Sequence, residues 1–475
     1  MTQPLLISGG RVVTMADGQP DEQALDVLID NGRIADLLPP GTRVENARVI
    51  PADGKIVAPG FVDTHRHVWQ TQLRTVAADW TLFEYIVNIR AVYSGFYGPE
   101  DAYLGNHLGA LEALNAGITT LVDHSHLVNS PQHADRLIDG LADAGLRARF
   151  CYGMFMNPKF DAAVQARSAS WPRETSPGWR YDDVRRVRKE RLASDDALLT
   201  LGVNPQEAES VPIDTLLHEI ALSRELGVGT ISMHVAMGGY DHGTQLVKAL
   251  AERGRLGPDL LFVHGAALTD EELRLIGEHQ CGLSTTPETE LQMGLGYPLA
   301  LSGRDAGTRI SLGIDIVSNY PGDMFTQMRL ALQTARAKDN AELARQGRGP
   351  RKLGVKVRDA LRVATLGGAE AIHLEKKIGS LEKGKAADLI VIATDSLAMV
   401  PAHDAVAAIV LGAAPTDVET VIVDGVVRKE ARALVGVDLP RLQDRLRESS
   451  ERIYASAKQV PRDEIEAFLA SRFRV

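Results

Sequence analysis

Two histidines near the start of the chain have the spacing of a metal-binding pair. The segment PGFVDTHRH (59–67) ends an apolar run with His65 and His67, two residues apart. In a β-strand such residues point to the same side, so both imidazoles can face one ion. Two imidazoles on one face suit a borderline metal such as zinc or iron. An H-x-H pair alone is usually structural, so the prediction of a metal site requires further ligands from other strands.

Three more titratable residues each close a separate apolar run. His234 ends the run ISMH, His264 ends FVH and Asp315 ends SLGID. Burying such side chains without compensating partners costs several kcal/mol, which makes packing a poor explanation for all three. The two cysteines, Cys151 and Cys281, are too few for a cysteine-rich zinc site. The sequence therefore predicts a metal centre held by histidine and carboxylate.

The elements that would carry these residues alternate between apolar strands and helices. The strands are mostly continuous runs of valine, isoleucine and leucine, which is typical of parallel strands buried on both faces. Eight such repeats predict an α/β fold, a (β/α)8 TIM-like barrel with its chemistry at the carboxyl ends of the strands. A doubly wound sheet is disfavoured because no glycine-rich phosphate loop follows the first strand. The candidate strands are 56–62, 118–122, 148–152, 198–203, 229–235, 260–263, 281–285 and 309–314, and the candidate helices include 101–116, 212–226, 269–278 and 323–337.

Both ends of the chain contain short β-prone runs separated by glycine-containing turns. Because neither end has enough apolar residues for its own core, we expect a small β-sandwich domain built from residues 1–58 and 376–436. Residues 59–375 then form the barrel, and 437–475 form a helical tail that packs on the barrel or a neighbouring subunit. The insertion 157–196 is interpreted either as a lid or as a solvated surface helix with a loop. The short runs are 5–7, 11–15, 24–29, 33–37, 388–392, 407–411 and 420–423.

The overall composition excludes several classes of protein. Of the 475 residues, 44% are hydrophobic and 24% are charged, which is ordinary for a globular protein. The 52 Lys+Arg and 62 Asp+Glu give a net charge of −10, which argues against nucleic acid and anionic membranes as partners. The first residues lack the features of a signal peptide, and no apolar run approaches the ~20 residues of a membrane span. We therefore expect a cytoplasmic protein whose partner is a small-molecule substrate.

Six motifs, taken in order, resemble those of the amidohydrolase superfamily. The resemblance is to the branch that holds cytosine, guanine and 8-oxoguanine deaminases and triazine hydrolases such as atrazine chlorohydrolase. It extends from the N-terminal β-prone runs to about residue 430. The motifs are PGFVDTHRH (59–67), ALNAGITTLVDH (113–124), MHVA (233–236), FVHGAALTDEEL (262–273), LGIDIVSN (312–319) and ATLGGAEAIHLEKKIGSLEKGKAADLIVI (364–392).

The resemblance implies a metal centre and its chemistry. One divalent ion is favoured over two because the fourth strand, 198–203, has no lysine for the carbamate bridge of the two-metal members. The ion is expected to be Zn²⁺, with Fe²⁺ or Mn²⁺ as alternatives, and to activate a water for attack on the substrate. Asp315 would take the proton of that water, and His264 would stabilise developing charge. The implied ligands are His65, His67, His234 and Asp315.

Further residues are expected to contact the substrate. The resemblance places Gln70, after the H-x-H pair, as a substrate contact. It also places Trp80 in an apolar pocket wall, with plain core packing as the alternative. His124, which alternates with His126 at the end of the second strand, either lines the pocket or hydrogen-bonds a metal ligand. Relatives of this kind also suggest a homo-oligomer, a dimer or larger.

The chain departs from its relatives at one catalytic position. In deaminases of this branch, the fifth strand is usually followed by the motif His-x-x-Glu, and that glutamate carries a proton to the leaving nitrogen. In this chain the glutamate position is Met237, whose thioether cannot transfer a proton. On an extended segment Glu288 and Glu290 would face the same way, so we expect Glu288 to be a substitute general acid and Glu290 to bind substrate. The alternative is that Glu290 caps the following helix or pairs with an arginine. Glu207 and Glu209, after the fourth strand, are weaker candidates of the same kind.

Together these features predict a metal-dependent hydrolase that breaks a C–N bond of a small nitrogen heterocycle or an amidine-like substrate and releases amine or ammonia. Because Met237 replaces the usual acid, the alternative is loss of a non-amine group, or a metal-assisted lyase or isomerase reaction on the same fold. A scaffold protein on a degenerate barrel is disfavoured, because every expected ligand is present in the sequence.

Overall fold

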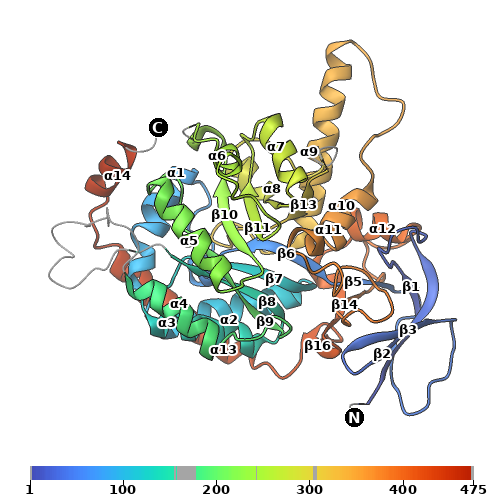
Figure 1. Cartoon of the computed structure of the whole chain (residues 1–475). Helices are drawn as coiled ribbons and strands as arrows, with labels where there is room; N and C mark the ends of the chain where they lie inside the picture. The colour runs from blue at the N-terminus through green and yellow to red at the C-terminus, as the bar shows by residue number, and fades with distance from the viewer. Residues whose placement is uncertain (1–2, 155–156, 158–177, 242, 303–306, 472–475) are drawn as a thin grey trace.

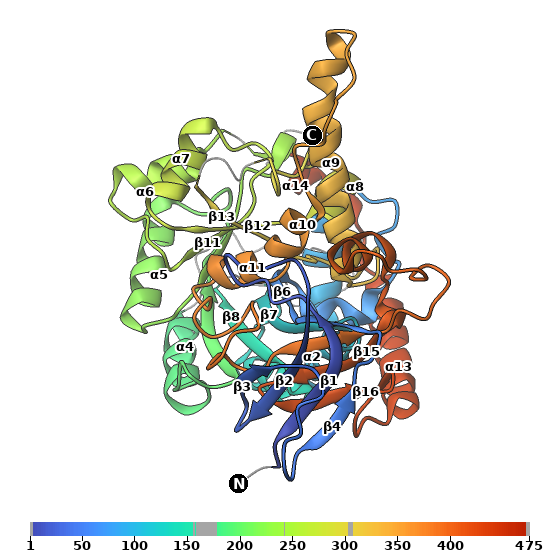
Figure 2. The same cartoon turned by 90° about the vertical axis from the view of Figure 1, so that its right-hand side faces the viewer.

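The computed structural model describes residues 3–154, 157, 178–241, 243–302 and 307–471. Two separate sheets organise this part of the chain: an eight-stranded parallel sheet and a nine-stranded mixed sheet. Helices surround the parallel sheet, and the two ends of the chain form the mixed sheet at one side of it (Figures 1 and 2). Within the described ranges, no helix is both long and apolar enough to cross a membrane.

The parallel sheet closes into a barrel. Its strands follow one another in chain order from β6 to β13. The last strand meets the first through a parallel bridge between Asp315 and Arg66, and the Asp315 N–H donates to the carbonyl of His65 at 2.8 Å. The predicted (β/α)8 fold is therefore confirmed. The strands are β6 (Phe61–Arg66), β7 (Ile118–Ser125), β8 (Arg147–Gly153), β9 (Leu199–Asn204), β10 (Ile231–Val235), β11 (Leu260–His264), β12 (Gly282–Thr285) and β13 (Arg309–Leu312).

Several helices around the barrel begin and end at residues suited to those positions. Helix α3 has Ser130 as its N-cap, Pro131 at its first position and Gly145 at its end with a φ of 74°. Helix α7 begins at a reciprocal capping box between Thr269 and Glu272. The helices of the barrel region are α1 (Leu82–Tyr85), α2 (Pro99–Asn115), α3 (Pro131–Ala144), α4 (Gly178–Glu190), α5 (Ile213–Glu225), α6 (Leu246–Glu252), α7 (Asp270–Glu278), α8 (Pro287–Gln292), α9 (Met324–Arg345), α10 (Val357–Val363) and α11 (Leu366–Ala371).

The mixed sheet joins the two ends of the chain, because β5 near the start pairs antiparallel with β14 near the end. The expected small β-domain built from both ends is therefore confirmed. Its buried face holds a separate apolar cluster that includes Ile7, Val27 and Ile422. Its strands are β1 (Leu5–Val12), β2 (Gln23–Asp30), β3 (Arg33–Leu38), β4 (Arg48–Pro51), β5 (Ile56–Pro59), β14 (Leu389–Ile392), β15 (Val418–Val423), β16 (Val426–Glu430) and β17 (Ala433–Leu434).

Two expectations about strands are wrong. The run 56–62 is not one barrel strand: it divides at Gly60 into β5 of the mixed sheet and β6 of the barrel. A side chain at Gly60 would collide with Thr119 of β7, since a Cβ atom there would lie 2.1 Å from its hydroxyl. The run 407–411 is helical rather than extended, because Asp404 caps a short helix by accepting the Ala407 N–H at 2.8 Å. A short apolar run cannot by itself distinguish the two structures.

The C-terminal tail is helical, as expected, and packs on the barrel. Its helices are α13 (Leu439–Ala457) and α14 (Asp463–Ala470). Ser449 of α13 donates its hydroxyl to Asp101 of α2 at 2.6 Å, and Arg452 pairs with the same carboxylate. Asp101 is buried, so these contacts fix the tail to the barrel wall.

The insertion after the third barrel strand is described only in part. Residues 158–177 lie outside the described residues, so the interpretation of 157–196 as a lid stays a prediction. A basic cluster of this segment lies on α4 and directly after it, and consists of Arg185, Arg186, Arg188, Lys189 and Arg191. Arg186 and Arg191 of that cluster pair with Asp135 of α3, and Arg191 also pairs with Asp139. These ion pairs attach α4 to the neighbouring barrel helix.

Candidate metal centre and active site

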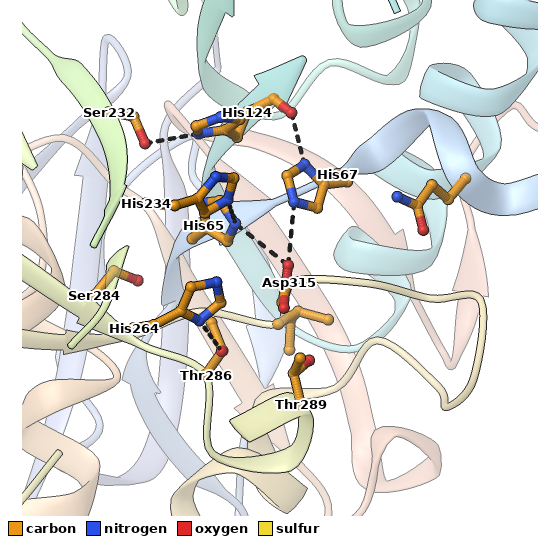
Figure 3. Close-up of polar contacts among 12 residues, drawn as sticks. His65, His67, His124, Ser232, His234, His264, Ser284, Thr286, Thr289 and Asp315 are labelled. Atoms are coloured by element: carbon orange, nitrogen blue, oxygen red, sulfur yellow. Dashed lines mark hydrogen bonds and ion pairs between the residues drawn. The ribbon is translucent and has the colours of Figure 1, made fainter. Parts of the chain in front are cut away.

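Five polar side chains from the ends of four barrel strands converge at one end of the barrel. Asp315 Oδ1 lies 3.3 Å from Nε2 of His65 and 3.2 Å from Nε2 of His67, and Nε2 of His234 lies 3.4 Å from Nε2 of His65 (Figure 3). His264 places a ring nitrogen within 4.8 Å of ligand atoms of His65 and Asp315. All five side chains are buried. The structure thus brings together the residues that the sequence singled out from separate strands.

These distances match the coordination cage of a tetrahedral ion. Two ligands about 2.1 Å from one ion and separated by the tetrahedral angle lie about 3.4 Å apart. Three of the six distances between ligand atoms are 3.2, 3.3 and 3.4 Å. Three imidazole nitrogens and one carboxylate oxygen form a donor set that suits zinc, iron or manganese. His65, His67, His234 and Asp315 therefore fit a single divalent ion.

The backbone turns sharply where two of these residues leave their strands. His264 and Asp315 adopt φ values of 76° and 70°, in the left-handed region that non-glycine residues rarely occupy. Such a conformation costs about 1–3 kcal/mol and persists only where the surrounding structure imposes it. At Gly313, just before Asp315, a Cβ atom would lie 2.8 Å from the Cβ atom of His65. Glycine there lets the last strand approach the first closely enough for Asp315 to face the histidines.

A second layer of hydrogen bonds fixes which nitrogen of His67 and of His234 faces the centre. His67 donates Nδ1–H to the carbonyl of His124 at 2.8 Å, which leaves its Nε2 as the ligand nitrogen. Nδ1 of His234 lies 2.9 Å from a carboxylate oxygen of Glu207, which orients His234 in the same manner. A carboxylate or carbonyl behind a metal-binding histidine raises the basicity of the imidazole and fixes its orientation.

Burial sets the protonation states of the ligands. It holds the pKa of His65 well below its ordinary value and lowers the pKa of His67, so both imidazoles stay neutral. Burial would raise the pKa of Asp315, but its close contacts with His65 and His67 outweigh burial and hold that pKa well below its usual range. Neutral imidazoles and an ionised carboxylate are the forms that bind a divalent cation.

His264 has different electrostatic surroundings from those of its neighbours. Its Nδ1 lies 2.9 Å from the Thr286 hydroxyl and 3.5 Å from a carboxylate oxygen of Glu290. Burial would lower the pKa of His264, but Glu290 and the charge of Asp315 outweigh it and raise that pKa. His264 is therefore suited to hold a proton and stabilise negative charge. Glu290 is fully buried behind it and accepts the Thr286 N–H at 2.8 Å, so it contacts His264 rather than the pocket.

Glu288 faces away from the histidines. The segment that carries it is helix α8 rather than extended chain, so the expectation that Glu288 and Glu290 face the same way is wrong. Pro287 begins the helix, and residues two apart on a helix point to nearly opposite sides. Glu288 accepts a hydrogen bond from the side-chain amide of Gln327 in α9 at 3.0 Å. The structure therefore does not bring Glu288 into the cluster.

The other expected substrate contacts occupy different places. Gln70 is buried and donates its side-chain amide to the hydroxyl of Tyr85 at 2.6 Å. Tyr85 lines the pocket, so Gln70 supports the pocket wall from behind this tyrosine. Trp80 is half-buried and packs against the core, outside the set of residues that line the pocket. His124 hydrogen-bonds Ser232 through Nδ1 at 2.9 Å, while its carbonyl holds His67. Its neighbour His126 lines the pocket.

A pocket opens above the histidines. The surface exposed in this pocket is largely apolar, although polar residues also line it, and Met237 contributes to the apolar part. Leu469 of the C-terminal helix α14 completes the apolar side, so the tail contributes to the site. The apolar lining is Leu82, Ile86, Met237, Met293, Ile316 and Leu469, and the polar lining outside the metal ligands includes Tyr85, Arg90, His126, Glu207, Glu209, Ser210, His264 and Thr289.

Among the pocket residues, Arg90 and Leu469 had no signal in the sequence, and Glu207 and Glu209 had a weak one. Arg90 lies on the helical turn that follows α1, and Leu469 lies near the chain end, so neither follows a barrel strand. Glu207 and Glu209 follow β9, a position where catalytic side chains of a barrel are expected. Their position directly after a barrel strand is therefore the sequence signal that favours these two glutamates as site residues.

The fold and site are those of a metal-dependent (β/α)8-barrel hydrolase, and comparisons with known proteins agree. A sequence model of the amidohydrolase family matches residues 56–428. The 5-methylthioadenosine/S-adenosylhomocysteine deaminase of Symbiobacterium thermophilum is 29% identical over 463 residues, covering 94% of this chain and 99% of the relative. That of Desulforudis audaxviator is 28% identical and covers 87% and 91%.

Solved structures agree in fold. An adenosine deaminase from Xanthomonas campestris with bound zinc has a TM-score of 0.81 at 25% identity and covers 95% of this chain and 98% of its own. Atrazine chlorohydrolase from Arthrobacter aurescens TC1, complexed with zinc, has a TM-score of 0.80 at 21% identity and covers 94% and 100%. The chain belongs to the amidohydrolase family. It is an enzyme that hydrolyses carbon–nitrogen bonds other than peptide bonds, which confirms the predicted class.

Proposed function

We propose that this enzyme is a zinc-dependent deaminase of a nitrogen heterocycle that carries an apolar substituent, with a purine nucleoside as the best-supported substrate class. The observation that carries the proposal is the arrangement of four ligand atoms, spaced for one ion, beneath a largely apolar pocket. The deaminases named above act on 5-methylthioadenosine, S-adenosylhomocysteine or adenosine. The zinc in the related structures supports zinc as the ion.

The side chains divide the chemistry among them. A divalent ion held by His65, His67, His234 and Asp315 would lower the pKa of a bound water towards ~7. Asp315 is ionised and can accept a proton at its carboxylate. His264, with its raised pKa, can hold a proton and stabilise negative charge that develops on the attacked ring.

Glu209 is the best candidate for the acid that Met237 cannot provide. It lines the pocket, and its Oε2 is buried without a hydrogen-bond partner among the described residues. Burial and the nearby charge of Glu207 raise the pKa of Glu209 to about 7, which suits proton transfer near neutral pH. Glu207 itself hydrogen-bonds His234, and its pKa is lowered, so it stays ionised. We assign to Glu209 the protonation of the leaving amine.

The test is ammonia release from a panel of aminopurine nucleosides, free aminopurines, aminopyrimidines and aminotriazines. We expect the zinc-loaded enzyme to release ammonia most efficiently from a purine nucleoside with an apolar 5′-substituent. Conversion of a panel member without ammonia would instead support a non-amine leaving group. A zinc-loaded enzyme that is inactive on the whole panel contradicts the proposed substrate class.

A further inference from the structure

A second group of metal-ligating side chains adjoins the first. Ligand atoms of His124, His126, Glu207 and His234 all lie within 4.8 Å of one another. The three histidines are buried, and Glu207 is half-buried at the pocket wall. The group comes from β7, the residue just after β7, the loop after β9, and β10. His234 is the residue it shares with the first centre.

The histidines of this group are held in place. His124 hydrogen-bonds Ser232 of β10 through Nδ1 at 2.9 Å, which leaves Nε2 as its ligand nitrogen (Figure 3). His126 stacks on the ring of the metal ligand His67, with centroids 4.0 Å apart and planes inclined by 23°. The rings of His124 and His234 have centroids 4.4 Å apart. Fixed rings at these distances place two further imidazoles beside the first centre.

Glu207 can serve both groups at once. Both of its oxygens lie close to Nδ1 of His234, at 2.9 and 3.2 Å. An ionised carboxylate has about four lone-pair sites, so it can accept the His234 N–H and still bind a cation. Two imidazoles and one carboxylate, with open positions towards a pocket, form a donor set that binds zinc in catalytic sites. Among the described residues, Glu207 is the member of this group that supplies negative charge.

We infer that the enzyme has a second divalent-cation site, formed by His124, His126 and Glu207 and adjoining the first through the His234–Glu207 hydrogen bond. Arg90 lines the same pocket, and its positive charge opposes a second cation, so this site is the weaker of the two. In two-metal hydrolases one ion acts on the attacking group and the other on the leaving group. A second cation beside the pocket would add a positive charge near a bound substrate.

The experiment counts metal on the full-length enzyme after chelation and reloading with Co²⁺ and, separately, with Zn²⁺. Metal content is measured by mass spectrometry, and binding is followed by calorimetry and the visible spectrum of Co²⁺. We expect two ions per chain, bound at least tenfold more weakly at the second site. His126→Asn should weaken the second step at least tenfold and keep the first. Glu207→Gln should weaken the second step at least tenfold and the first step by a smaller factor, because Glu207 also supports the metal ligand His234. His107→Gln is the matched control, because this buried histidine of α2 contacts Gly140 at 3.2 Å and belongs to neither group.

A single binding step in the wild type, with the same stoichiometry in both variants, would overturn the second site. Circular dichroism shows whether each variant is folded. If His126→Asn does not fold, the conservative variant Glu207→Gln still tests the second site. Anomalous diffraction at the metal edge should show two peaks, one beside His65 and one beside His126. Because these readouts count ions rather than products, they are independent of the proposed deaminase activity.

Discussion

Replacing Glu288 by glutamine should stabilise the protein in a pH-dependent way without reducing its activity. Burial, together with the charge of Asp323, raises the pKa of Glu288 from 4.5 to about 7. Below pH 4.5 the carboxyl is protonated in both the folded and the unfolded chain and has no effect. Between pH 4.5 and 7 the unfolded chain loses this proton while the folded chain keeps it, so stability falls as the pH rises.

The size of this effect follows from the two pKa values. The difference of about 2.5 units, at about 1.4 kcal/mol per unit, gives an upper bound of about 3.4 kcal/mol above pH 7. Because Glu288 is partly exposed, we expect about half of that, or about 1–2 kcal/mol. Glutamine keeps an oxygen that can accept the amide of Gln327, so the hydrogen bond to α9 is retained.

The assay is urea denaturation of wild type, Glu288→Gln and the control Glu448→Gln, an exposed glutamate of α13, at pH 5 and pH 8. The gain in unfolding free energy of Glu288→Gln should be larger at pH 8 than at pH 5, and the control should show no gain. Activity should stay near wild type. A loss of a hundredfold or more in kcat with normal metal content would refute the geometry and restore Glu288 as the general acid.

Two further predictions concern the pocket. Glu209→Gln should lower kcat about 10²-fold or more while zinc content stays normal, since positioned proton transfer contributes about 10²–10⁴-fold to the rate. The kcat is measured by steady-state ammonia release. An unchanged kcat would show that Glu209 takes no part in the reaction. Leu469→Ala should raise KM for an apolar substrate several-fold with a smaller change in kcat, because Leu469 lines the pocket. The control is Leu439→Ala, which changes an exposed leucine of α13. Equal effects of the two substitutions would exclude a specific role for the tail in substrate binding.

The metal centre was predictable because each of its residues ends an apolar strand. Parallel strands of a barrel bring their carboxyl ends to one face, so His65, His234, His264 and Asp315 had to meet once the fold was known. Their exact distances depend on the positive φ of His264 and Asp315, which no local pattern indicates. The position of the centre could be predicted, but its backbone geometry could not.

The rest of the site depends on tertiary contacts. Glu288 and Glu290 were placed on an extended segment, yet Pro287 begins a helix that turns Glu290 to His264 and Glu288 to α9. Leu469 of α14 reaches the pocket near the end of the chain, where Arg462, just before α14, donates to the side-chain oxygen of Asn88 at 2.7 Å. The domain boundaries, a homo-oligomer and a cytoplasmic location stay predictions.

The most direct test of the account is the dependence of deamination on the ion at the first centre. Zinc content and ammonia release should be measured on one preparation of wild type, after chelation and after zinc is restored, alongside His234→Asn and the control His107→Gln. We expect ammonia release to fall at least a hundredfold on chelation and to return in proportion to the zinc bound. His234→Asn should lose zinc at the first centre and activity together, and His107→Gln should keep both. Full ammonia release from zinc-free enzyme, or from His234→Asn, would contradict the account.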